Sequence, residues 1–531
     1  MSTSNLSNAP LLVVGAGIMG AGIAQVAAQA GHTVLLHDAR PGAAAEAISK
    51  LAKSLDGLVA KGKLSAESVT QTLARISAVG AIEEAAPVRL VVEAIVEQLD
   101  AKRALFKQLE AIVAPDCVLA TNTSSISVTA IANGLTHPGR LVGMHFFNPV
   151  PLMKLVEVVS GLQTDAAVAE AIFELSKAWG KTPVHARSTP GFIVNRIARP
   201  YYAETMALLQ EQAATPAVLD ACLRAVGFRM GPCELMDLIG HDTNFSVTRS
   251  VYEANFYDKR FVPSLVQREM VDGGLLGRKT GKGFYDYAEG AVRPAISAHV
   301  AGEFPQARRL CLHGSGPVAD RFAAALGAAG LSFGRAPASS WVGIEADGAQ
   351  LRLTDGRTAA QIGAPAAAPL GTQAVEVSST TSESGRGVDV AVFDLPLGAE
   401  PGAALAWSVS PAASAAWAAA APQWLRAAGF NAQQVADAPG LVVARTVAML
   451  INEAADAVHQ GVCSTEGADA AMKLGVNYPA GPFEWLARWD AQGVITVLEQ
   501  LDAWYRGERY RVSPWLRGQA SLAASRSGAG A

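Results

Sequence analysis

Short apolar runs alternate with longer amphipathic stretches through the first part of the chain. The apolar runs occupy residues 11–14, 90–95, 117–122, 141–145 and 154–159. Such runs are typical of strands buried on both faces of a parallel sheet, and the stretches between them predict the helices that cover it. We therefore expect residues 1–188 to form an α/β domain with a mainly parallel sheet.

After residues 189–191 the apolar positions follow a helical spacing instead. Apolar residues recur about once per helical turn from Ile193 to Leu209, and the same pattern returns over residues 218–226. This periodicity predicts packed helices. We expect an all-α domain over residues 189–288.

The second half of the chain repeats this helical pattern. The sequence at 439–445 echoes that at 190–196, and the sequence at 481–484 echoes that at 231–234, with spacings that differ by one residue. Self-similarity at a fixed separation indicates an internal duplication. The second half is expected to hold a degenerate α/β segment at 289–420 and, at 421–531, a second all-α domain that ends in a flexible tail of about a dozen residues.

Gly15, Gly17 and Gly20 lie between the first predicted strand and the helix that follows it. In this pattern Gly15 permits a tight turn, Gly17 lets the backbone approach a pyrophosphate, and Gly20 allows close packing of the helix. The helix N-terminus, with Ile18 and Met19, then offers N–H groups to the phosphates. These five residues predict a dinucleotide site in a Rossmann-type domain.

Asp38 stands at the end of the next predicted strand, where a carboxylate can accept hydrogen bonds from the adenosine ribose. Because a carboxylate repels a 2′-phosphate, NAD is the expected cofactor, although Arg40 leaves NADP as the less favoured choice. The stretch 310–319 is similar to a decayed copy of the glycine motif, and the run 331–335 after it has no acid at its end. We expect no second NAD there, and the segment 289–420 is interpreted as a degenerate Rossmann-like domain.

Composition excludes several other classes of protein. The 531 residues carry a net charge of −4 and 17% charged residues, so no basic footprint for nucleic acid is present. No apolar run approaches about 20 residues without Gly, Pro or charge, so we expect no membrane span and a cytoplasmic protein. The five cysteines show no CxxC spacing, and neither a metal site nor a disulfide framework is expected.

A histidine and a carboxylate are the candidate catalytic residues. His145 ends a predicted strand, where open α/β sheets place their ligands, although a single histidine there is more often a core residue. Glu157 lies between two valines after a short Pro-containing turn, so its strand could run beside that of His145 and orient the imidazole. Such a pair near a nicotinamide is suited to removing an alcohol proton while hydride leaves the same carbon.

Four segments together closely resemble the L-3-hydroxyacyl-CoA dehydrogenases, namely residues 122–125, 145–157, 189–196 and 279–285. The resemblance covers residues 10–287, and the longer duplicated chain is similar to bacterial members that act on 3-hydroxyadipyl-CoA in phenylacetate catabolism. It implies that His145 is the general base, Glu157 holds it, Ser124 hydrogen-bonds the substrate 3-oxygen, and Asn195 reaches in from the helical domain.

The same resemblance implies further ligand contacts. Cofactor contacts are expected from Glu97, Lys102, Ser124 and Lys279, and contacts to the CoA moiety from Ser54, Lys61 and Ser124. Exposed Ser and Lys on a helix are by default solvated surface, which stays the alternative for Ser54 and Lys61. In the second copy Ala444 stands where Asn195 stands in the first, and the sequence at 145–149 has no match, so that copy is expected to be catalytically silent.

The expected reaction is NAD-dependent oxidation of an L-3-hydroxyacyl-CoA to the 3-ketoacyl-CoA, with 3-hydroxyadipyl-CoA as the favoured substrate. Short-chain 3-hydroxybutyryl-CoA, in fatty-acid or butanoate metabolism, is the alternative, and a non-catalytic NAD-binding relative is the remote one. A pocket for a terminal carboxylate is not evident. Arg199, Arg224 and Arg229 are candidates by charge alone and are expected at the surface.

Partners are expected to be small molecules, with no nucleic acid and no membrane. The resemblance implies that the helical domain pairs with a second copy, commonly across a homodimer. Because this chain carries its own second copy, residues 421–518 could cover residues 189–287 within one chain. We expect either a monomer with a fused pseudo-subunit or a homodimer.

Overall fold

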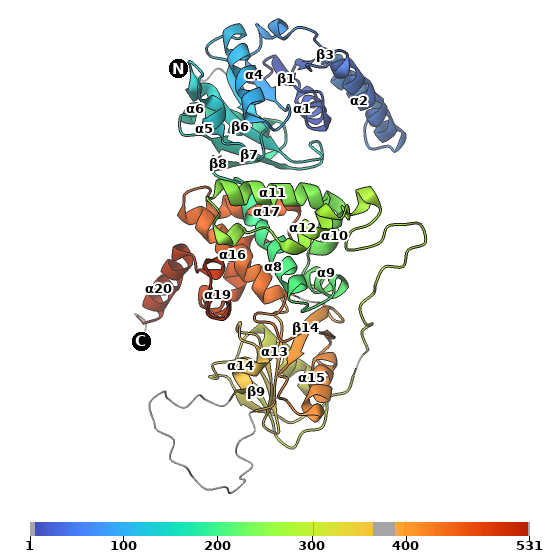
Figure 1. The fold of residues 1–531 in the computed structure, drawn as a ribbon, viewed down its shortest axis with the longest axis vertical. Helices are drawn as coiled ribbons and strands as arrows, with labels where there is room; N and C mark the ends of the chain where they lie inside the picture. Colours follow the sequence, from blue (N-terminus) through green and yellow to red (C-terminus); the bar gives the residue numbers. More distant parts are fainter. Residues whose placement is uncertain (1–5, 301, 365–387, 399, 529–531) are drawn as a thin grey trace. The chain divides into compact units, whose positions relative to one another are not determined.

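The computed structural model describes residues 6–300, 302–364, 388–398 and 400–528. Figure 1 shows the chain coloured along its sequence. It divides into two compact units: the first holds residues 1–198 and 454–484, and the second holds residues 199–453 and 485–531. In the described part of the chain no helix combines the length and apolar character that a membrane crossing requires.

The first unit contains an eight-stranded sheet in the order β3-β2-β1-β4-β5-β6-β7-β8. All neighbouring pairs are parallel except β6 and β7, which confirms the mainly parallel sheet. The strands are β1 (Leu11–Val14), β2 (Val34–His37), β3 (Ile76–Ala78), β4 (Leu90–Glu93), β5 (Val118–Thr121), β6 (Leu141–Phe146), β7 (Leu155–Ser160) and β8 (Thr182–Arg187).

Helices cover this sheet and complete its core. The central strands are buried over their whole length, as expected for strands enclosed on both faces. The helices are α1 (Ile18–Gln29), α2 (Ala43–Ala60), α3 (Ala66–Ala74), α4 (Leu99–Ile112), α5 (Val128–Ala132), α6 (Ala166–Ala178) and α7 (Val194–Ile197), with the 3-10 turns η1 (Ile82–Ala85) and η2 (Pro138–Arg140).

One helix of the second copy, α17 (Thr465–Val476), belongs to the first unit. It packs against α7, β7 and β8. Its buried residues are Ala468, Ala471, Met472 and Gly475, and the small residues Ala468, Ala471 and Gly475 allow the close approach. The contact with α7 agrees with the expectation that residues 421–518 cover residues 189–287, whereas the contacts with β7 and β8 were not predicted, because segments so far apart leave no local signal.

The helical part of the second unit combines elements of both copies. The first copy contributes α8 (Arg199–Gln210), α9 (Pro216–Ala225), α10 (Pro232–Ile239), α11 (His241–Ala254), α12 (Leu265–Asp272), η3 (Lys259–Phe261) and η4 (Arg278–Thr280). The second contributes α19 (Ala491–Tyr505), η6 (Glu508–Tyr510), α20 (Pro514–Gly528) and the parts of α16 (Val443–His459) and α18 (Pro482–Trp489) that fall within this unit.

The predicted tail requires a correction. Most of the last dozen residues lie in α20, which continues to Gly528, because Ala, Leu, Arg and Ser favour or tolerate a helix there. Residues 529–531 lie outside the described part of the chain.

A second, seven-stranded sheet has the order β10-β9-β11-β12-β13-β14-β15. Its last three strands repeat the pairing of β6, β7 and β8, since β13 is antiparallel to β14 and β14 is parallel to β15. The strands are β9 (Leu310–His313), β10 (Gly334–Ala336), β11 (Gly343–Ala346), β12 (Ala349–Leu353), β13 (Val390–Phe393), β14 (Ala404–Val409) and β15 (Asn431–Gln434), flanked by α13 (Pro317–Ala328), α14 (Ala359–Gly363) and α15 (Ala415–Ala427).

The predicted end of this α/β segment at residue 420 is too early. Residue 420 lies inside α15, and β15 still pairs with β14 after it. The strand was not predicted because it is an edge strand with the polar sequence NAQQ, which lacks the apolar alternation of a typical strand.

Candidate active site

The glycine turn has the geometry of a phosphate-binding loop. Gly15 has φ +107°, and a Cβ there would lie 2.5 Å from the carbonyl oxygen of Ala94, while a Cβ on Gly20 would lie 1.7 Å from the carbonyl oxygen of Gly15. A Cβ on Gly17 would meet nothing within 4 Å. Gly15 and Gly20 are therefore fixed by close packing, and Gly17 borders open space at the N-terminus of α1, where no side chain caps the helix. This arrangement fits the pyrophosphate of a dinucleotide.

Asp38 follows β2 and braces the glycine turn. Its Oδ2 accepts a hydrogen bond from the amide N of Ala16 at 2.8 Å, and its Oδ1 accepts one from the amide N of Arg40 at 2.9 Å. The guanidinium of Arg40 pairs instead with Glu46, with Nη2 and Oε2 3.1 Å apart at the surface. The carboxylate thus lies at the turn, and the nearby cation is engaged by another carboxylate.

His145 and Glu157 face each other across the antiparallel pair β6 and β7. His145 Nδ1 lies 2.5 Å from Glu157 Oε2, and both side chains are buried. The rings of Phe147 and Phe192 contact the imidazole, with centroids 4.5 and 5.8 Å from its own. The structure therefore confirms the expected neighbouring strands and orients the imidazole so that Nε2 is the nitrogen left for another partner.

The second carboxylate oxygen of Glu157 binds the start of α7. Its Oε1 accepts hydrogen bonds from the amide nitrogens of Ile193 and Val194, each at 3.0 Å. Helix N-terminal amides favour a negative charge, so they stabilise the ionised carboxylate. Glu157 links the histidine to the short helix that carries Asn195.

Ser124 and Asn195 also lie together. Asn195 Nδ2 donates to the carbonyl oxygen of Ser124 at 3.4 Å. Glu97 Oε1 accepts from the amide nitrogens of Ser124 and Ser125 at 2.9 and 3.0 Å and from the hydroxyl of Thr123 at 2.7 Å. Although burial opposes ionisation, Lys102 and these donors hold the pKa of Glu97 below its usual range. Glu97 thus fixes the loop after β5.

Lys102 does not have the exposed position expected of a cofactor contact. Its side chain is 1% exposed, and Nζ lies 2.6 Å from Glu93 Oε1 and 3.2 Å from Glu97 Oε2. Glu93 also accepts from the hydroxyl of Thr121 at 2.7 Å. A buried ammonium needs such partners. Lys102 is therefore held by both carboxylates and helps to fix the Glu97 side chain. Glu93 was missed by sequence reasoning, yet a carboxylate at the end of an apolar run was the signal that could have revealed it.

The expected CoA contacts and Lys279 take no part in the hydrogen bonds described above. Ser54 and the residue after α2, Lys61, are both exposed, and their spacing of two helical turns places them on one face. Lys279 belongs to the second unit, where it pairs with Asp242. The structure neither joins these three residues to the His145 site nor contradicts their predicted roles.

The second copy shows what stands at the matching positions. At the sequence offset that relates Pro439 to Pro190, Asp394 matches His145 and Ala406 matches Glu157, and the registers of both strand pairs agree with this alignment. Asp394 Oδ2 accepts from the amide nitrogens of Val442 and Val443 at 2.9 and 2.6 Å. A carboxylate still binds the start of the helix, but no histidine remains.

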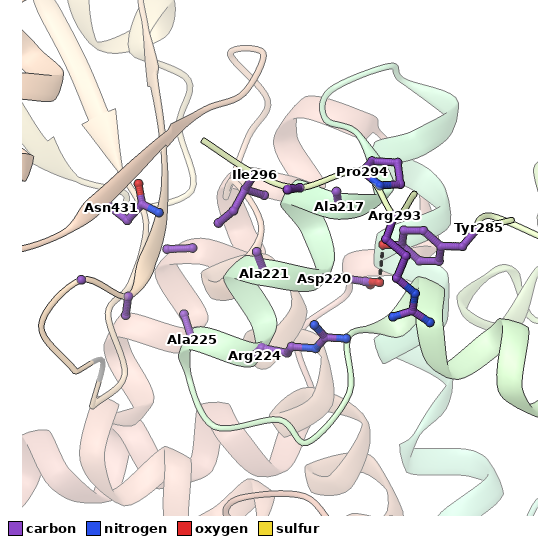
Figure 2. A pocket seen from close by; sticks show the side chains of 14 residues that line it. Ala217, Asp220, Ala221, Arg224, Ala225, Tyr285, Arg293, Pro294, Ile296 and Asn431 are labelled. Carbon is purple, nitrogen blue, oxygen red and sulfur yellow. Dashed lines mark hydrogen bonds between the residues drawn. The ribbon is translucent and has the colours of Figure 1, made fainter. Parts of the chain in front are cut away.

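Figure 2 shows a cavity of about 520 Å³ within the second unit, lined by α9, the segment after Tyr285 and the starts of β14 and β15. Arg224 and Arg293 line it, and both pair with Glu234, with Arg293 Nη1 donating to Oε1 at 2.9 Å. Because its arginines are engaged and its lining includes no residue of the histidine site, we do not connect this cavity with that site.

Arg199 and Arg229 are the other two arginines considered for binding a terminal carboxylate of the substrate. Arg199 was expected at the surface and is instead buried, since its Nη1 donates to Thr248 Oγ1 at 3.1 Å and its guanidinium lies over the ring of Tyr202. Arg229 is exposed, as expected.

Family models match most of the chain. The model described as "3-hydroxyacyl-CoA dehydrogenase, NAD binding domain" matches residues 11–189, and "3-hydroxyacyl-CoA dehydrogenase, C-terminal domain" matches twice, at 191–287 and 440–529. A third, "3-hydroxybutyryl-CoA dehydrogenase reduced Rossmann-fold domain", matches 376–439. The double match confirms the internal duplication.

Curated relatives match at full and at half length. The chain is 44% identical over 511 residues to the 3-hydroxyadipyl-CoA dehydrogenase of Escherichia coli K12, covering 96% of this chain and 97% of the relative. It is also 44% identical to a probable 3-hydroxybutyryl-CoA dehydrogenase of Deinococcus radiodurans, covering 52% of this chain and 99% of that relative.

Solved structures show the same two lengths. A crystal structure of 3-hydroxybutyryl-CoA dehydrogenase from Escherichia coli K12 matches with a TM-score of 0.83 and 41% identity, covering 98% of this chain and 99% of that one. An (S)-3-hydroxybutyryl-CoA dehydrogenase from Ralstonia eutropha matches with a TM-score of 0.52 and 40% identity, covering 53% of this chain and all of that one.

Proposed function

The chain belongs to the 3-hydroxyacyl-CoA dehydrogenase family, and from this premise we propose that it oxidises an L-3-hydroxyacyl-CoA to the 3-ketoacyl-CoA with NAD, in the cytoplasm. The observation that carries the proposal is the buried His145–Glu157 pair, whose carboxylate also binds the start of α7. Both groups are held before any substrate arrives. A positioned base of this kind is what proton removal from an alcohol requires.

His145 is the general base in this proposal. Glu157 binds Nδ1, which keeps the proton there and leaves Nε2 free to accept the proton of the substrate 3-hydroxyl. The cofactor, when bound, supplies the chemistry of accepting hydride from C3. As the proton passes to Nε2, the imidazole becomes positively charged, and the Glu157 carboxylate stabilises that charge. The products are the ketone and a protonated His145.

Ser124 and Asn195 are proposed to bind the substrate 3-oxygen. Ser124 lies in the loop after β5, and Asn195 Nδ2 donates to its backbone carbonyl oxygen at 3.4 Å, which supports this proposal. A hydroxyl and an amide can donate hydrogen bonds to the oxygen on which charge develops during the reaction. These two groups would stabilise that oxygen by being held in a fixed position, not by giving up a proton.

The cofactor is proposed to be NAD rather than NADP. Asp38 keeps a carboxylate at the glycine turn, where it repels a 2′-phosphate, and Arg40 is paired with Glu46. Gly15, Gly17, Ile18, Met19 and Gly20 would bind the pyrophosphate. Glu97 and Lys279 are kept as proposed cofactor contacts, and Lys102 is proposed to act through Glu97. Ser54 and Lys61 are proposed to contact CoA, where the ammonium would neutralise phosphate charge.

We propose 3-hydroxyadipyl-CoA, in phenylacetate catabolism, as the substrate, because the curated relative that matches this chain over its full length is named for that substrate. 3-Hydroxybutyryl-CoA is the second candidate, since a solved structure of the same length is named for it. Both candidates share the reacting 3-hydroxyl and differ in whether the acyl chain ends in a carboxylate.

NADH formation with a panel of L-3-hydroxyacyl-CoAs tests the proposal, with His145→Gln as the control for the chemistry. The expected result is a higher kcat/KM for 3-hydroxyadipyl-CoA than for 3-hydroxybutyryl-CoA, with activity on both lost in the variant. A preference for the four-carbon substrate would favour the second candidate. No activity on any substrate would favour the non-catalytic alternative.

The two helical copies are proposed to form a pseudo-dimer within one chain. In the second unit, Arg509 Nη2 of the second copy lies 2.8 Å from Glu204 Oε1 of the first. The reciprocal pair joins Arg260 Nη1 of the first copy to Glu453 Oε2 of the second at 3.2 Å. Arg260 and Arg509 lie in the matching turns η3 and η6, which contact each other. Such reciprocity is characteristic of a two-fold interface.

A further inference from the structure

We infer that the silent second copy contributes to catalysis by holding α7 in place, with Gln460 and Gly475 as positioning residues. The inference rests on the proposed function, because it concerns the same histidine site. Residues 454–484 lie in one unit with that site, although they come from the other copy. They would act through α7 and contact neither substrate nor cofactor.

Helix α7 needs support from outside itself. It has only four residues, Val194–Ile197, and so short a helix is not stable alone. Two groups of the site depend on it: the Glu157 carboxylate binds the amide nitrogens of Ile193 and Val194, and Asn195 reaches the Ser124 backbone. A small shift of α7 therefore moves the partner of His145 and the proposed ligand of the 3-oxygen together.

The segment after α16 provides polar contacts to this region. Gln460 Oε1 accepts a hydrogen bond from Arg196 Nη1, on α7, at 2.8 Å. The carbonyl oxygen of Val462 accepts one from the amide nitrogen of Arg187, at the end of β8, at 2.9 Å. Because Arg196 is buried, losing its amide partner would leave a guanidinium N–H without that acceptor and would allow α7 to move.

Helix α17 provides the apolar contacts. A Cβ on Gly475 would lie 3.0 Å from Val194 Cγ2 and 2.7 Å from Leu155 Cδ2. Val194 is the residue whose amide binds Glu157. A side chain at position 475 would thus press on the side chain of Val194, the residue whose backbone amide holds the carboxylate.

Cys463 belongs to the same segment of the second copy, and the charge of Glu157 affects its thiol. Burial and the negative charge of Glu157 raise the pKa of the Cys463 thiol to about 12, while Arg196 acts in the opposite direction. The thiol is therefore neutral at physiological pH.

The test compares Gln460→Ala, Gly475→Ala and Gly475→Leu with the wild-type full-length protein. Ala and Leu favour helix more than Gly, so neither change at 475 weakens α17 itself. Single-turnover NADH formation is followed with NAD limiting and enzyme and substrate in excess. The rate constant reports hydride transfer in folded molecules, and the amplitude of that phase reports how many molecules are competent.

Gln460→Ala and Gly475→Leu are expected to lower the rate constant about tenfold to a hundredfold, with Gly475→Ala between Gly475→Leu and wild type, while NAD affinity stays within about twofold. The matched control is Glu211→Ala. Glu211 occupies the position of Gln460 in the first copy and pairs with Arg445, far along the chain from His145. This control is expected to keep the wild-type rate constant.

Unchanged rate constants in Gln460→Ala and Gly475→Leu would overturn the inference. So would a loss of amplitude alone, since that result would mean misfolding rather than displacement of α7. Failure of the proposed function is distinguishable, because the wild-type protein would then show no turnover to compare.

Discussion

At the scale of single residues, the site depends on one carboxylate with two kinds of partner. Glu157 binds His145 Nδ1 through one oxygen and two backbone amides through the other. Both oxygens must accept hydrogen bonds, and a side-chain amide cannot do so at both ends. The residue type is therefore set by the geometry as much as by charge.

Glu157→Gln is expected to lower kcat about 10³-fold. With its oxygen on the amides of α7, the Gln side chain turns an N–H toward Nδ1, so the histidine proton moves to Nε2, the atom that must accept the substrate proton. KM for NAD is expected to stay at its wild-type value. Steady-state kinetics checks both values. A kcat within about threefold of wild type would contradict the role of Glu157 in orienting His145.

Asn195→Ala is expected to lower kcat about 10²-fold, as for loss of one donor to a developing oxyanion. NAD affinity, measured by fluorescence titration, is expected to be unchanged, because Asn195 binds the Ser124 backbone whereas Asp38 braces the glycine turn. Equal losses of turnover and NAD binding would mean that Asn195 has a structural role instead.

At the scale of elements, the sequence predicted what depends on local pattern. The apolar runs placed β1, β4, β5, β6 and β7 of the first sheet but not β3 or β8, and the proline-containing turn correctly put Glu157 beside His145. It did not predict the burial of Lys102, which depends on the ion pairs with Glu93 and Glu97, or the edge strand β15, whose polar sequence lacks apolar alternation. The packing of α17 against β7 and β8 was missed because these segments lie far apart in the sequence.

Asp394 provides a pH-dependent prediction for the second unit. Burial raises its pKa from 3.8 to about 6, although the backbone amides of α16 act in the opposite direction. Between these pH values the folded chain keeps a proton that the unfolded chain has lost. The stabilising contribution of the protonated group is thus present near pH 4 and is lost as pH rises through about 6.

Asp394→Asn removes this titration. The free energy of unfolding of the wild type, minus that of the variant, is expected to fall by on the order of 2 kcal/mol between pH 4.5 and pH 7.5. Denaturant unfolding of both proteins across that range measures it. Two parallel curves would show that Asp394 titrates normally.

At the scale of the whole molecule, the duplication gives one chain a second helical copy, which half-length relatives do not have. Those relatives cover about half of this chain and nearly all of their own length, so the first half has counterparts that exist alone. The reciprocal pairs Arg509–Glu204 and Arg260–Glu453 join the two copies here.

Burial opposes ionisation of Glu204, yet Arg509 and Arg445 hold its pKa below the usual range.

The full-length chain is therefore expected to be a monomer in sedimentation equilibrium at micromolar concentration. A fragment of residues 1–290 is expected to dimerise, because the surface that the second copy covers would be exposed. A full-length dimer formed through the first helical copy would contradict the pseudo-dimer, as would a fragment that stays monomeric.

The reciprocal interface also bears on how such a protein can change over generations. In a homodimer every substitution appears on both sides of the two-fold axis, so a change that suits one side is imposed on the other. Here the two sides mutate independently, and they already differ: Gln460 contacts Arg196, whereas Glu211 contacts Arg445 at the matching position of the other copy. Fusion thus lets natural selection adjust the surroundings of one catalytic centre without duplicating each adjustment.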